Sequence, residues 1–369
     1  MRIVFFVHSL ISDWNHGNAH FLRGVITELK SRGHNVKVLE PFDSWSVKNL
    51  IEEHKGDLQP ILSGFGAFYP ELSSIRYDRG SLDLDRELDG ADLVIVHEWN
   101  ETDLVGRIGS HRKFNTGYRL LFHDTHHRSV TAPQVMGSYD LSGYDGVLAF
   151  GEVIRGIYIE KGWAQRVWTW HEAADIRVFK PLEGDIKGDI VWIGNWGDEE
   201  RSAELSEFLF EPVKDLGLKC RVYGVRYPGH AIKVLNDYGI GYGGWTPNYL
   251  VPRLFSSFRF TVHVPRRPYQ RALPGIPTIR VFEALACKIP LICSPWEDRE
   301  GLFRDGRDYL VAGDGREMRR KMEYLIRDRG AAGALAAAGY ETVLSRHTCG
   351  NRVDELMGIC KELGIKDNG

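Results

Sequence analysis

The chain has 369 residues, of which 43% are hydrophobic and 26% charged, and its formal net charge is −3. This length exceeds what one hydrophobic core usually serves, so we expect two domains. The charge argues against a broad electrostatic surface for nucleic acid, although a local basic patch is left open.

No apolar run approaches the roughly 18 residues that suggest a membrane span. The N-terminus enters an apolar segment directly, without a signal-peptide pattern. The five cysteines show no metal-ligand spacing, and free thiols in a reducing compartment account for them most simply. We therefore expect a protein of the cytoplasm.

The first half of the chain alternates between apolar runs and helical periodicity. A helix is expected from Asn18 and another over residues 152–161. Residues 40–80 are poorly periodic, and we assign no element to them. Buried strands are predicted at residues 2–7, 36–39, 92–96, 119–122, 146–150 and 166–170.

Polar side chains follow three of these predicted strands. In an open parallel sheet, ligands bind beyond the carboxyl ends of the strands, which meet at one edge. We therefore expect these side chains to cluster into a site, where a His or Asp could bind a substrate hydroxyl or act as a base. The side chains are His8 with Asp13 and His16, His97 with Glu98, and His123 with Asp124.

The run from His123 to His127 could also be a metal-binding site. Neighbouring histidines on a loop can bind zinc, but neither HExxH nor paired CxxC spacing accompanies them. We predict no metal, and we expect His123, Asp124 and His126 to face a substrate instead.

Residues 171–181 (HEAADIRVFKP) are predicted to be a hinge between the domains. A second alternating series follows, and the predicted fold class is α/β: two doubly wound, Rossmann-like domains facing each other across a cleft, residues 1–170 and 171–350. The last helical segment, within residues 351–369, could cross back onto the first domain. Strands of the second series are predicted at residues 189–193, 219–223, 259–264 and 309–311, and helices fill residues 314–363.

The turn Gly194-Asn195-Trp196-Gly197 lies between a predicted strand and a helix that carries Arg201. Such a turn can present backbone N–H groups to a phosphate. An ordinary strand-to-helix turn is an equally good interpretation, and both stay open.

The stretch from Arg271 to Trp296 reads as loop, helix and buried strand. Thr278 is a good N-cap residue for the helix. Arg280 and Glu283 share the face opposite the most apolar one, where Arg280 and the exposed N–H groups could bind phosphate and Glu283 could bind hydroxyls. The alternative is a surface Arg–Glu pair worth about 0.2–0.5 kcal/mol.

Two other patterns are rejected. Residues 239–244 satisfy G-x-G-x-x-G, but they neither follow a predicted strand nor open a helix, so they are no dinucleotide fingerprint. No G-x-S-x-G sequence is present, and acyl transfer therefore has no support.

Residues 280–292 read R-x-F-E-x-L-A-x-x-x-P-L-I. With two doubly wound domains, this sequence resembles GT-B glycosyltransferases of the retaining family 4 kind, and within them the branch related to spore-maturation glycosyltransferases. The resemblance covers nearly the whole chain, more firmly beyond His123. It implies an N-terminal domain for the acceptor and a C-terminal domain for a nucleotide-sugar, with Glu283 on the donor ribose and His123 near the transferred sugar.

The resemblance also gives roles to three loops. Residues 194–201 match the loop that faces the donor diphosphate, residues 244–248 match the base-side turn, and residues 171–181 match the interdomain stretch. The chain departs from the usual E-x₇-E pair, because Gly275 stands at the first position, and the sugar contact of that glutamate is missing. Arg280 or the backbone of residues 274–278 could replace it. Lys288 also stands at a position where the family commonly has Gly. This departure could affect only the C-cap of the helix that carries Glu283.

The sequence therefore predicts a metal-independent glycosyltransferase that moves a hexose-type sugar from a nucleoside-diphosphate sugar to a hydroxyl acceptor. A UDP-sugar is the expected donor, and a GDP-sugar is the second choice. By resemblance we expect retention; if the reaction inverts, Asp13, His16 or Asp124 should be the base. The predicted catalytic residues are His123, Asp124, His126, His16 and Asp13, and the predicted donor-binding residues are Gly194, Asn195, Arg201, Tyr223, Thr278, Arg280 and Glu283.

Other functions are compatible with the same double-Rossmann layout. A nucleotide-sugar 2-epimerase needs carboxylates for proton abstraction and no acceptor. A non-catalytic nucleotide-sugar-binding protein is suggested by Gly275. A DNA-modifying glucosyltransferase shares the fold, but the acidic charge balance argues against nucleic acid as a partner. The acceptor and the oligomeric state are left open.

Overall fold

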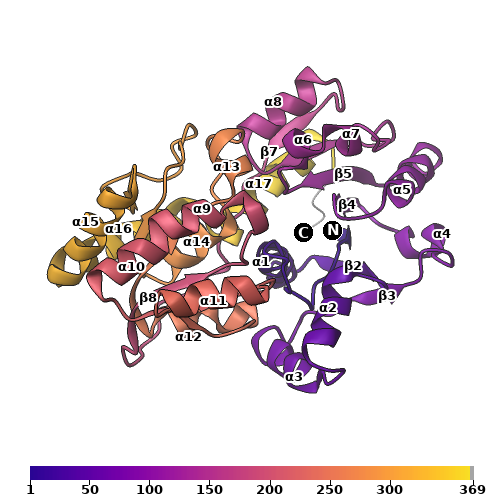
Figure 1. Cartoon of the computed structure of the whole chain (residues 1–369). Helices are drawn as coiled ribbons and strands as arrows, with labels where there is room; N and C mark the ends of the chain where they lie inside the picture. Colours follow the sequence, from indigo (N-terminus) through magenta and orange to yellow (C-terminus); the bar gives the residue numbers. More distant parts are fainter. Residues whose placement is uncertain (366–369) are drawn as a thin grey trace. The chain divides into compact units, whose positions relative to one another are not determined.

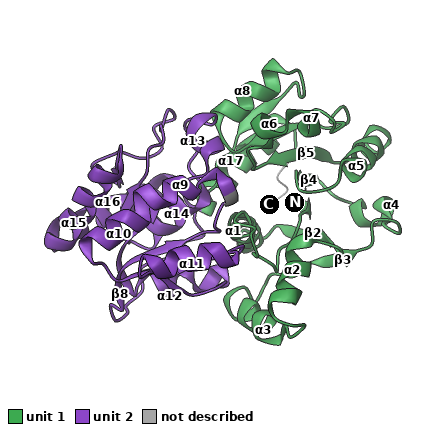
Figure 2. Cartoon of the chain, viewed as in Figure 1, with its two compact units in different colours: residues 1–172, 349–369 green, residues 173–348 purple. Residues whose placement is uncertain are grey.

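The computed structural model describes residues 1–365, and these residues form two compact units (Figure 2). The first unit contains residues 1–172 and the segment from Cys349 onward, and the second contains residues 173–348. Each unit is built on one sheet with helices around it (Figure 1). Within the described residues the first sheet has the strand order β3-β2-β1-β4-β5-β6-β7 and the second β10-β9-β8-β11-β12-β13. The predicted α/β class with two parallel, Rossmann-like sheets is confirmed.

The strands of the first sheet are short, buried and parallel, as their apolar runs predict. Neighbouring strands pair in register, so that Ile3 of β1 faces Leu93 of β4 and His97 of β4 faces His123 of β5. The strands are β1 (Arg2–Phe6), β2 (Asn35–Pro41), β3 (Ile75–Tyr77), β4 (Leu93–His97), β5 (Arg119–Asp124), β6 (Gly146–Ala149) and β7 (Val167–Thr169).

The helices of the first unit follow the apolar periodicity where that periodicity is strong. In α1, Phe21, Leu22, Val25 and Leu29 are buried together, and Gly33 lies beyond the end of the helix at a φ of +84°. The helices are α1 (Ala19–Ser31), α2 (Trp45–Glu53), α3 (Gln59–Phe68), α4 (Leu84–Leu88), α5 (Thr102–Phe114), α6 (Arg128–Thr131), α7 (Pro133–Met136), α8 (Glu152–Glu160) and α17 (Cys349–Glu362).

Residues 40–80, which carried no prediction, contain two helices and a strand. Helix α3 begins with a proline in its first turn, which suits a helix start. Only Ile61 and Phe65 of α3 are buried. Two buried residues four apart do not make a recognisable periodic face, and for this reason the sequence did not reveal the helix.

The second unit repeats the strand–helix alternation on a six-stranded sheet within the described part of the chain. Its strands are β8 (Gly188–Ile193), β9 (Cys220–Tyr223), β10 (Gly241–Tyr242), β11 (Phe258–His263), β12 (Leu291–Cys293) and β13 (Leu310–Val311). Its helices are α9 (Ser202–Leu205), α10 (Glu211–Leu216), α11 (Gly229–Asp237), α12 (Val251–Phe255), α13 (Arg267–Arg271), α14 (Ile279–Ala286), α15 (Gly315–Arg327) and α16 (Arg329–Arg346).

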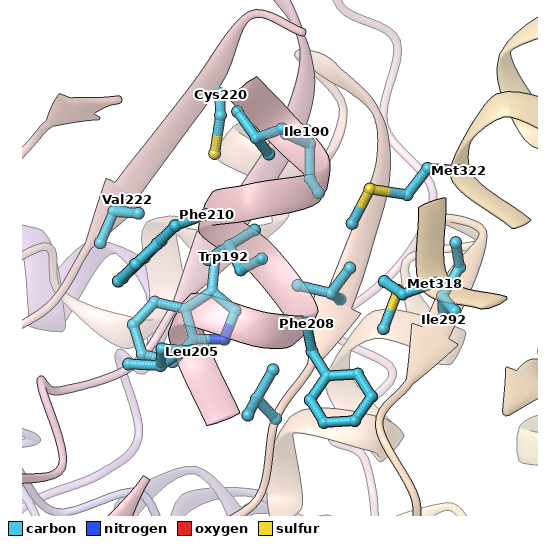
Figure 3. Packing of buried hydrophobic residues seen from close by; sticks show 14 of the residues in the cluster. Ile190, Trp192, Leu205, Phe208, Phe210, Cys220, Val222, Ile292, Met318 and Met322 are labelled. Atoms are coloured by element: carbon cyan, nitrogen blue, oxygen red, sulfur yellow. The ribbon is translucent and has the colours of Figure 1, made fainter. Parts of the chain in front are cut away.

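The core on one face of this second sheet is rich in large side chains. Trp192 of β8 lies with Leu205 and Phe210 in the same buried cluster, which also takes in Met318 and Met322 of α15 (Figure 3). A π-helical segment, Ser206–Phe210, joins α9 to α10 and places Phe208, Leu209 and Phe210 in this core. Burying such side chains stabilises a fold by about 1.5–3 kcal/mol each.

The last helix, α17, belongs to the first unit and packs against α1. The indole N–H of Trp170 donates to the carbonyl oxygen of Arg352 at 2.8 Å, and both groups are buried. The expected C-terminal segment ran to residue 369, and residues 366–369 lie outside the described residues.

No helix among residues 1–365 has both the length and the apolar character needed to cross a membrane.

Candidate functional site

Histidines line the carboxyl edge of the first sheet. His8 follows β1, His97 is the last residue of β4, and His123 lies near the end of β5. The ring centroids of His8 and His16 are 5.4 Å apart, those of His16 and His97 6.1 Å, and those of His97 and His123 5.4 Å. Parallel pairing thus brings the three polar strand ends into one histidine row, His8–His16–His97–His123.

All four rings of the histidine row are neutral. Burial lowers the pKa of His8 and of His97 to about 3, and it lowers the pKa of His16 and of His123 well below the ordinary value. Several of their buried nitrogens have no hydrogen-bond partner among residues 1–365, namely Nε2 of His16, Nδ1 of His97 and both ring nitrogens of His123. Buried polar atoms normally have partners, so these nitrogens mark a place for water or ligand hydroxyls.

Glu98 joins this row through His97. Its Oε2 lies 2.9 Å from Nε2 of His97, and the hydroxyl oxygen of Thr125 lies 3.0 Å from the same nitrogen. A carboxylate held against one ring nitrogen fixes the tautomer and directs the lone pair of the other nitrogen. Sequence reasoning grouped Glu98 with the polar strand ends but did not include it among the site residues. The signal was its place directly after a buried strand that ends in His.

Asp124 is held rigidly beside Glu98. The Tyr158 hydroxyl donates to Oδ2 of Asp124 at 2.9 Å, and the backbone N–H of His126 donates to Oδ1 at 3.0 Å. Burial, and then the charge of Glu98, raise the pKa of Asp124 to about 7, while burial raises the pKa of Glu98 to about 7 as well. Two neighbouring buried carboxyl groups resist being charged together.

Asp13 has a different environment from the other predicted catalytic residues. Its Oδ2 lies 2.8 Å from the guanidinium of Arg23, which is fully buried. Arg23 also donates to the carbonyl oxygens of Leu10 and Ile11. Asp13 would have to give up this ion pair to accept a proton, so the structure favours an anchoring role for Asp13 over that of a base.

In the second unit, Arg201 organises the turn after β8. Its guanidinium donates to the carbonyl oxygen and to Oδ1 of Asn195, and to the carbonyl oxygen of Val264 at 3.1 Å. It also lies over the ring of Trp192, 5.0 Å from the centroid. Burial lowers the pKa of Arg201 to about 10, so the side chain stays charged at neutral pH. These contacts make Arg201 a support for the turn, and its Nε has no partner among the described residues.

Tyr223 and the glycines bring neighbouring loops close to this turn. The N–H of Gly194 donates to the carbonyl oxygen of Tyr223 at 2.9 Å. A Cβ on Gly224 would lie 2.0 Å from the carbonyl oxygen of Gly194, and one on Gly243 would lie 2.2 Å from the Tyr223 ring. Only glycine allows these approaches. Tyr223 and Gly194 thus lie together, next to the predicted base-side turn.

Glu283 of α14 is the centre of a charged cluster. Its Oε1 accepts a hydrogen bond of 2.6 Å from the amide of Asn248, and its Oε2 forms an ion pair with Arg280. The Glu283 side chain is 0% exposed, whereas that of Arg280 is 19% exposed. The alternative of a surface Arg–Glu pair therefore does not describe these residues, because the carboxylate is buried and the arginine is mostly buried.

His263 at the end of β11 reaches the first residue of this helix. Its Nε2 lies 2.9 Å from the hydroxyl oxygen of Thr278, and its Nδ1 is buried without a partner in the described part of the chain. Thr278 is the N-cap residue, but its side chain does not cap the helix because it is committed to His263. Burial lowers the pKa of His263 to about 3. Sequence reasoning missed His263, although a His that ends an apolar strand was again the available signal.

Gly275, the departure from the expected glutamate pair, has a structural reason. It has a φ of +94°, and a Cβ there would lie 2.9 Å from Cγ of Glu300. A glutamate at this position would therefore need a strained backbone and would displace the Glu300 side chain.

Part of the chain also matches a known family. Residues 201–358 match a family model described as glycosyl transferase-like. The chain carries a glycosyltransferase domain. No curated protein sequence matches the chain. No group of three or more His, Cys, Asp or Glu residues within residues 1–365 is arranged to hold a metal ion.

Solved structures share the fold over the full length of the chain. A glycosyltransferase from Rickettsia africae ESF-5 superposes with a TM-score of 0.69 at 13% identity, covering 99% of both chains. An alpha-glucosyltransferase in complex with UDP and a 13-mer DNA containing a HMU base gives 0.71 at 14% identity, covering 98% of this chain and 99% of that one. HepE from Anabaena, in complex with UDP and glucose, gives 0.67 at 14% identity, covering 98% and 100%. The fold is that of GT-B glycosyltransferases.

Proposed function

We propose that this glycosyltransferase takes a UDP-sugar as its donor and transfers the sugar, of hexose type, to a hydroxyl acceptor. The observation that carries the proposal is the cluster of Glu283, Arg280 and Asn248 at the start of α14, inside the segment that matches the glycosyl transferase-like family. UDP is preferred over GDP because HepE and the alpha-glucosyltransferase both hold UDP. The R-x-F-E-x-L-A sequence supports membership of the spore-maturation branch.

The donor would be held by three groups of the second unit. Glu283, oriented by Asn248, accepts from the ribose hydroxyls. Arg280, the more exposed member of the pair, and the N–H groups of the first turn of α14 bind the diphosphate. Arg201 keeps the turn of residues 194–197 in place, so that its backbone can approach the phosphates.

We propose transfer with retention and without a metal. The bond from the anomeric carbon to the diphosphate oxygen breaks as the bond to the acceptor oxygen forms, and the acceptor proton passes to the leaving diphosphate. Arg280 and backbone N–H groups stabilise the charge that develops on the diphosphate. Asp13 is engaged by Arg23 and Asp124 by Tyr158, so neither is available as a ready base, which is consistent with a reaction that needs none. His123, with two unpartnered nitrogens among the described residues, would contact the transferred sugar.

The variant Glu283→Gln tests the donor site. Glutamine keeps the size of the side chain but loses the charge, so we expect the Kd for UDP measured by calorimetry to rise about tenfold or more, since hydrogen bonds to charged groups contribute about 1.5–3 kcal/mol. Glu297→Gln, a change at an exposed ion pair with Arg299, is the matched control and should bind UDP as the wild type does. An unchanged UDP affinity in Glu283→Gln would remove Glu283 from the site.

Product analysis tests the reaction. NMR of the product with a UDP-hexose should show the anomeric configuration of the donor, and a chelator should leave the rate unchanged. An inverted product would contradict retention, and loss of activity with the chelator would contradict metal independence. Tight binding of UDP-sugars without turnover on a broad acceptor panel would make the protein a binding protein, and an epimerised sugar formed without acceptor would make it an epimerase.

A further inference from the structure

Three partly exposed tryptophans surround the outer end of the histidine row. The ring centroids of Trp14 and Trp45 are 6.4 Å apart, and those of Trp45 and Trp99 5.8 Å. His8 lies 4.7 Å from Trp45 and 6.1 Å from Trp99. We call Trp14, Trp45 and Trp99 the tryptophan cluster.

The tryptophan cluster comes from three separate segments that end at the same edge of the first sheet. Trp14 lies in the loop after β1, Trp45 begins α2 after β2, and Trp99 follows β4. The indole N–H of Trp14 donates to Glu53 at 3.4 Å, whereas those of Trp45 and Trp99 have no acceptor among residues 1–365. Indoles normally keep such N–H groups for water or a ligand when they are partly exposed.

The nitrogens behind this cluster need hydroxyl-like partners. His16 and His97, the two residues of the row between His8 and His123, each present one buried ring nitrogen without a partner in the described part of the chain, Nε2 of His16 and Nδ1 of His97. A neutral imidazole has one nitrogen that donates and one that accepts. Water and sugar hydroxyls, which both donate and accept, can satisfy such a mixed set.

The arginines nearby are largely engaged by protein groups, which disfavours an anionic ligand. Arg23 is used by Asp13 and two carbonyl oxygens. Arg128 lies over the Trp99 ring, 4.5 Å from the centroid, and donates to the carbonyl oxygen of Glu98, while its buried Nε has no partner among residues 1–365. A planar aromatic ligand could stack on an indole, but it would offer few hydroxyls to the histidines.

We propose that the tryptophan cluster and the histidine row together bind a neutral saccharide, and that this saccharide is the acceptor of the transfer reaction. The apolar C–H face of a pyranose ring would lie against Trp45 or Trp99, and its hydroxyls would reach the unpartnered imidazole nitrogens. The acceptor role rests on the proposed function, whereas saccharide binding by the first unit stands independently of it.

The test uses the full chain and no nucleotide-sugar. Saturation-transfer difference NMR and tryptophan fluorescence are recorded with maltotriose, cellotriose and chitotriose. We expect saturable binding of at least one of them, with the strongest transfer to ring C–H protons of one pyranose. Trp99→Ala should raise the Kd about tenfold or more, as truncation of an aromatic anchor does, and Trp99→Phe should restore part of the affinity.

Phe114→Ala is the matched control, because Phe114 is 88% exposed at the far end of α5. It should leave saccharide binding unchanged, and both variants should bind UDP and melt as the wild type does. Trp45→Ala provides a second variant if Trp99→Ala melts early.

Absence of binding for all three saccharides would overturn the inference, and so would Trp99-dependent binding of a phenol, a nucleoside or DNA in their place. If a saccharide binds while UDP does not, the proposed function fails and the saccharide site stands. If the protein turns over a UDP-sugar on a non-saccharide acceptor and binds none of the three saccharides, the proposed function stands and the saccharide site fails.

Discussion

Gly275 carries a strict conformational requirement in the loop before α14. Its φ of +94° lies in the left-handed region, and its missing side chain leaves room for Glu300. We expect Gly275→Ala to lower the free energy of unfolding by about 1–2 kcal/mol, through backbone strain and the contact with Glu300. The thermal melting of the full chain measures this loss.

Gly156→Ala is the control for that experiment. Gly156 lies inside α8, and a Cβ there would meet no atom within 4 Å. Alanine should stabilise this helix by about 0.5–1 kcal/mol, because glycine costs more backbone entropy. If Gly275→Ala melted no earlier than the wild type, the steric reason for the missing glutamate would be wrong.

At the scale of elements, the connection between β1 and α1 is held by one side chain. Arg23 on α1 is fully buried and reaches Leu10, Ile11 and Asp13 of the loop. Its guanidinium also lies 5.1 Å from the ring centroid of Phe65 on α3. The loop that carries His16 is therefore fixed by a helix on one side and an aromatic ring on the other.

We expect Arg23→Lys to release this loop. Lysine keeps the charge but cannot donate in three directions from a planar group, so buried carbonyl and carboxylate oxygens lose partners. The expected destabilisation is about 1–3 kcal/mol, as for leaving buried acceptors without a hydrogen-bond donor. Hydrogen exchange of residues 8–18 should accelerate. Arg86→Lys, at a side chain that is 73% exposed, is the control and should change stability by no more than about 0.5 kcal/mol. If the loop exchanged as slowly in Arg23→Lys as in Arg86→Lys, the anchoring role would be contradicted.

At the scale of the whole molecule, the histidine row predicts how stability depends on pH. Burial lowers the pKa of His8 and His97 from 6.5 to about 3, and those of His16 and His123 shift in the same direction. Below about pH 6.5 the unfolded chain therefore takes up protons that the folded chain does not, and stability falls as the pH falls, by at most about 1.4 kcal/mol per pH unit for each group.

Glu98 and Asp124 act in the opposite direction. Their folded pKa values are raised to about 7, so the folded chain keeps protons that the unfolded chain releases between about pH 4 and 7. The four histidines contribute more protons to the difference between the unfolded and folded chains than the two carboxyl groups do. We therefore expect the urea midpoint to be highest near about pH 7 and to fall on acidification.

His97→Asn should reduce the slope of this dependence, measured by urea unfolding between about pH 5 and 7, because the unfolded chain then has one group fewer that takes up a proton in this range. His230→Asn, at an exposed position of α11, is the control and should leave the slope unchanged. A slope that stays the same in His97→Asn would show that His97 titrates alike in the folded and unfolded chain.

The sequence alone determined the elements whose side chains face one environment along their whole length. The buried strands β1, β4 and β5, and helix α1 with its continuous apolar face, follow directly from their apolar patterns. The positions of His8, His97 and His123 at strand ends were also readable, because parallel pairing places such ends at one edge. Helix α3 was not readable, since it buries only two residues.

The tertiary structure decided what each polar side chain does. Asp13, proposed as a base, is engaged by Arg23, which lies on a different element, and Arg201, proposed for the diphosphate, supports its own turn. Glu283 is buried against Asn248, 35 positions away, and Thr278 is turned to His263 instead of its own helix. These partners are distant in sequence, and hydrogen bonds and ion pairs form over a few ångströms of space. A sequence therefore shows which polar groups exist, and the fold determines which of them meet.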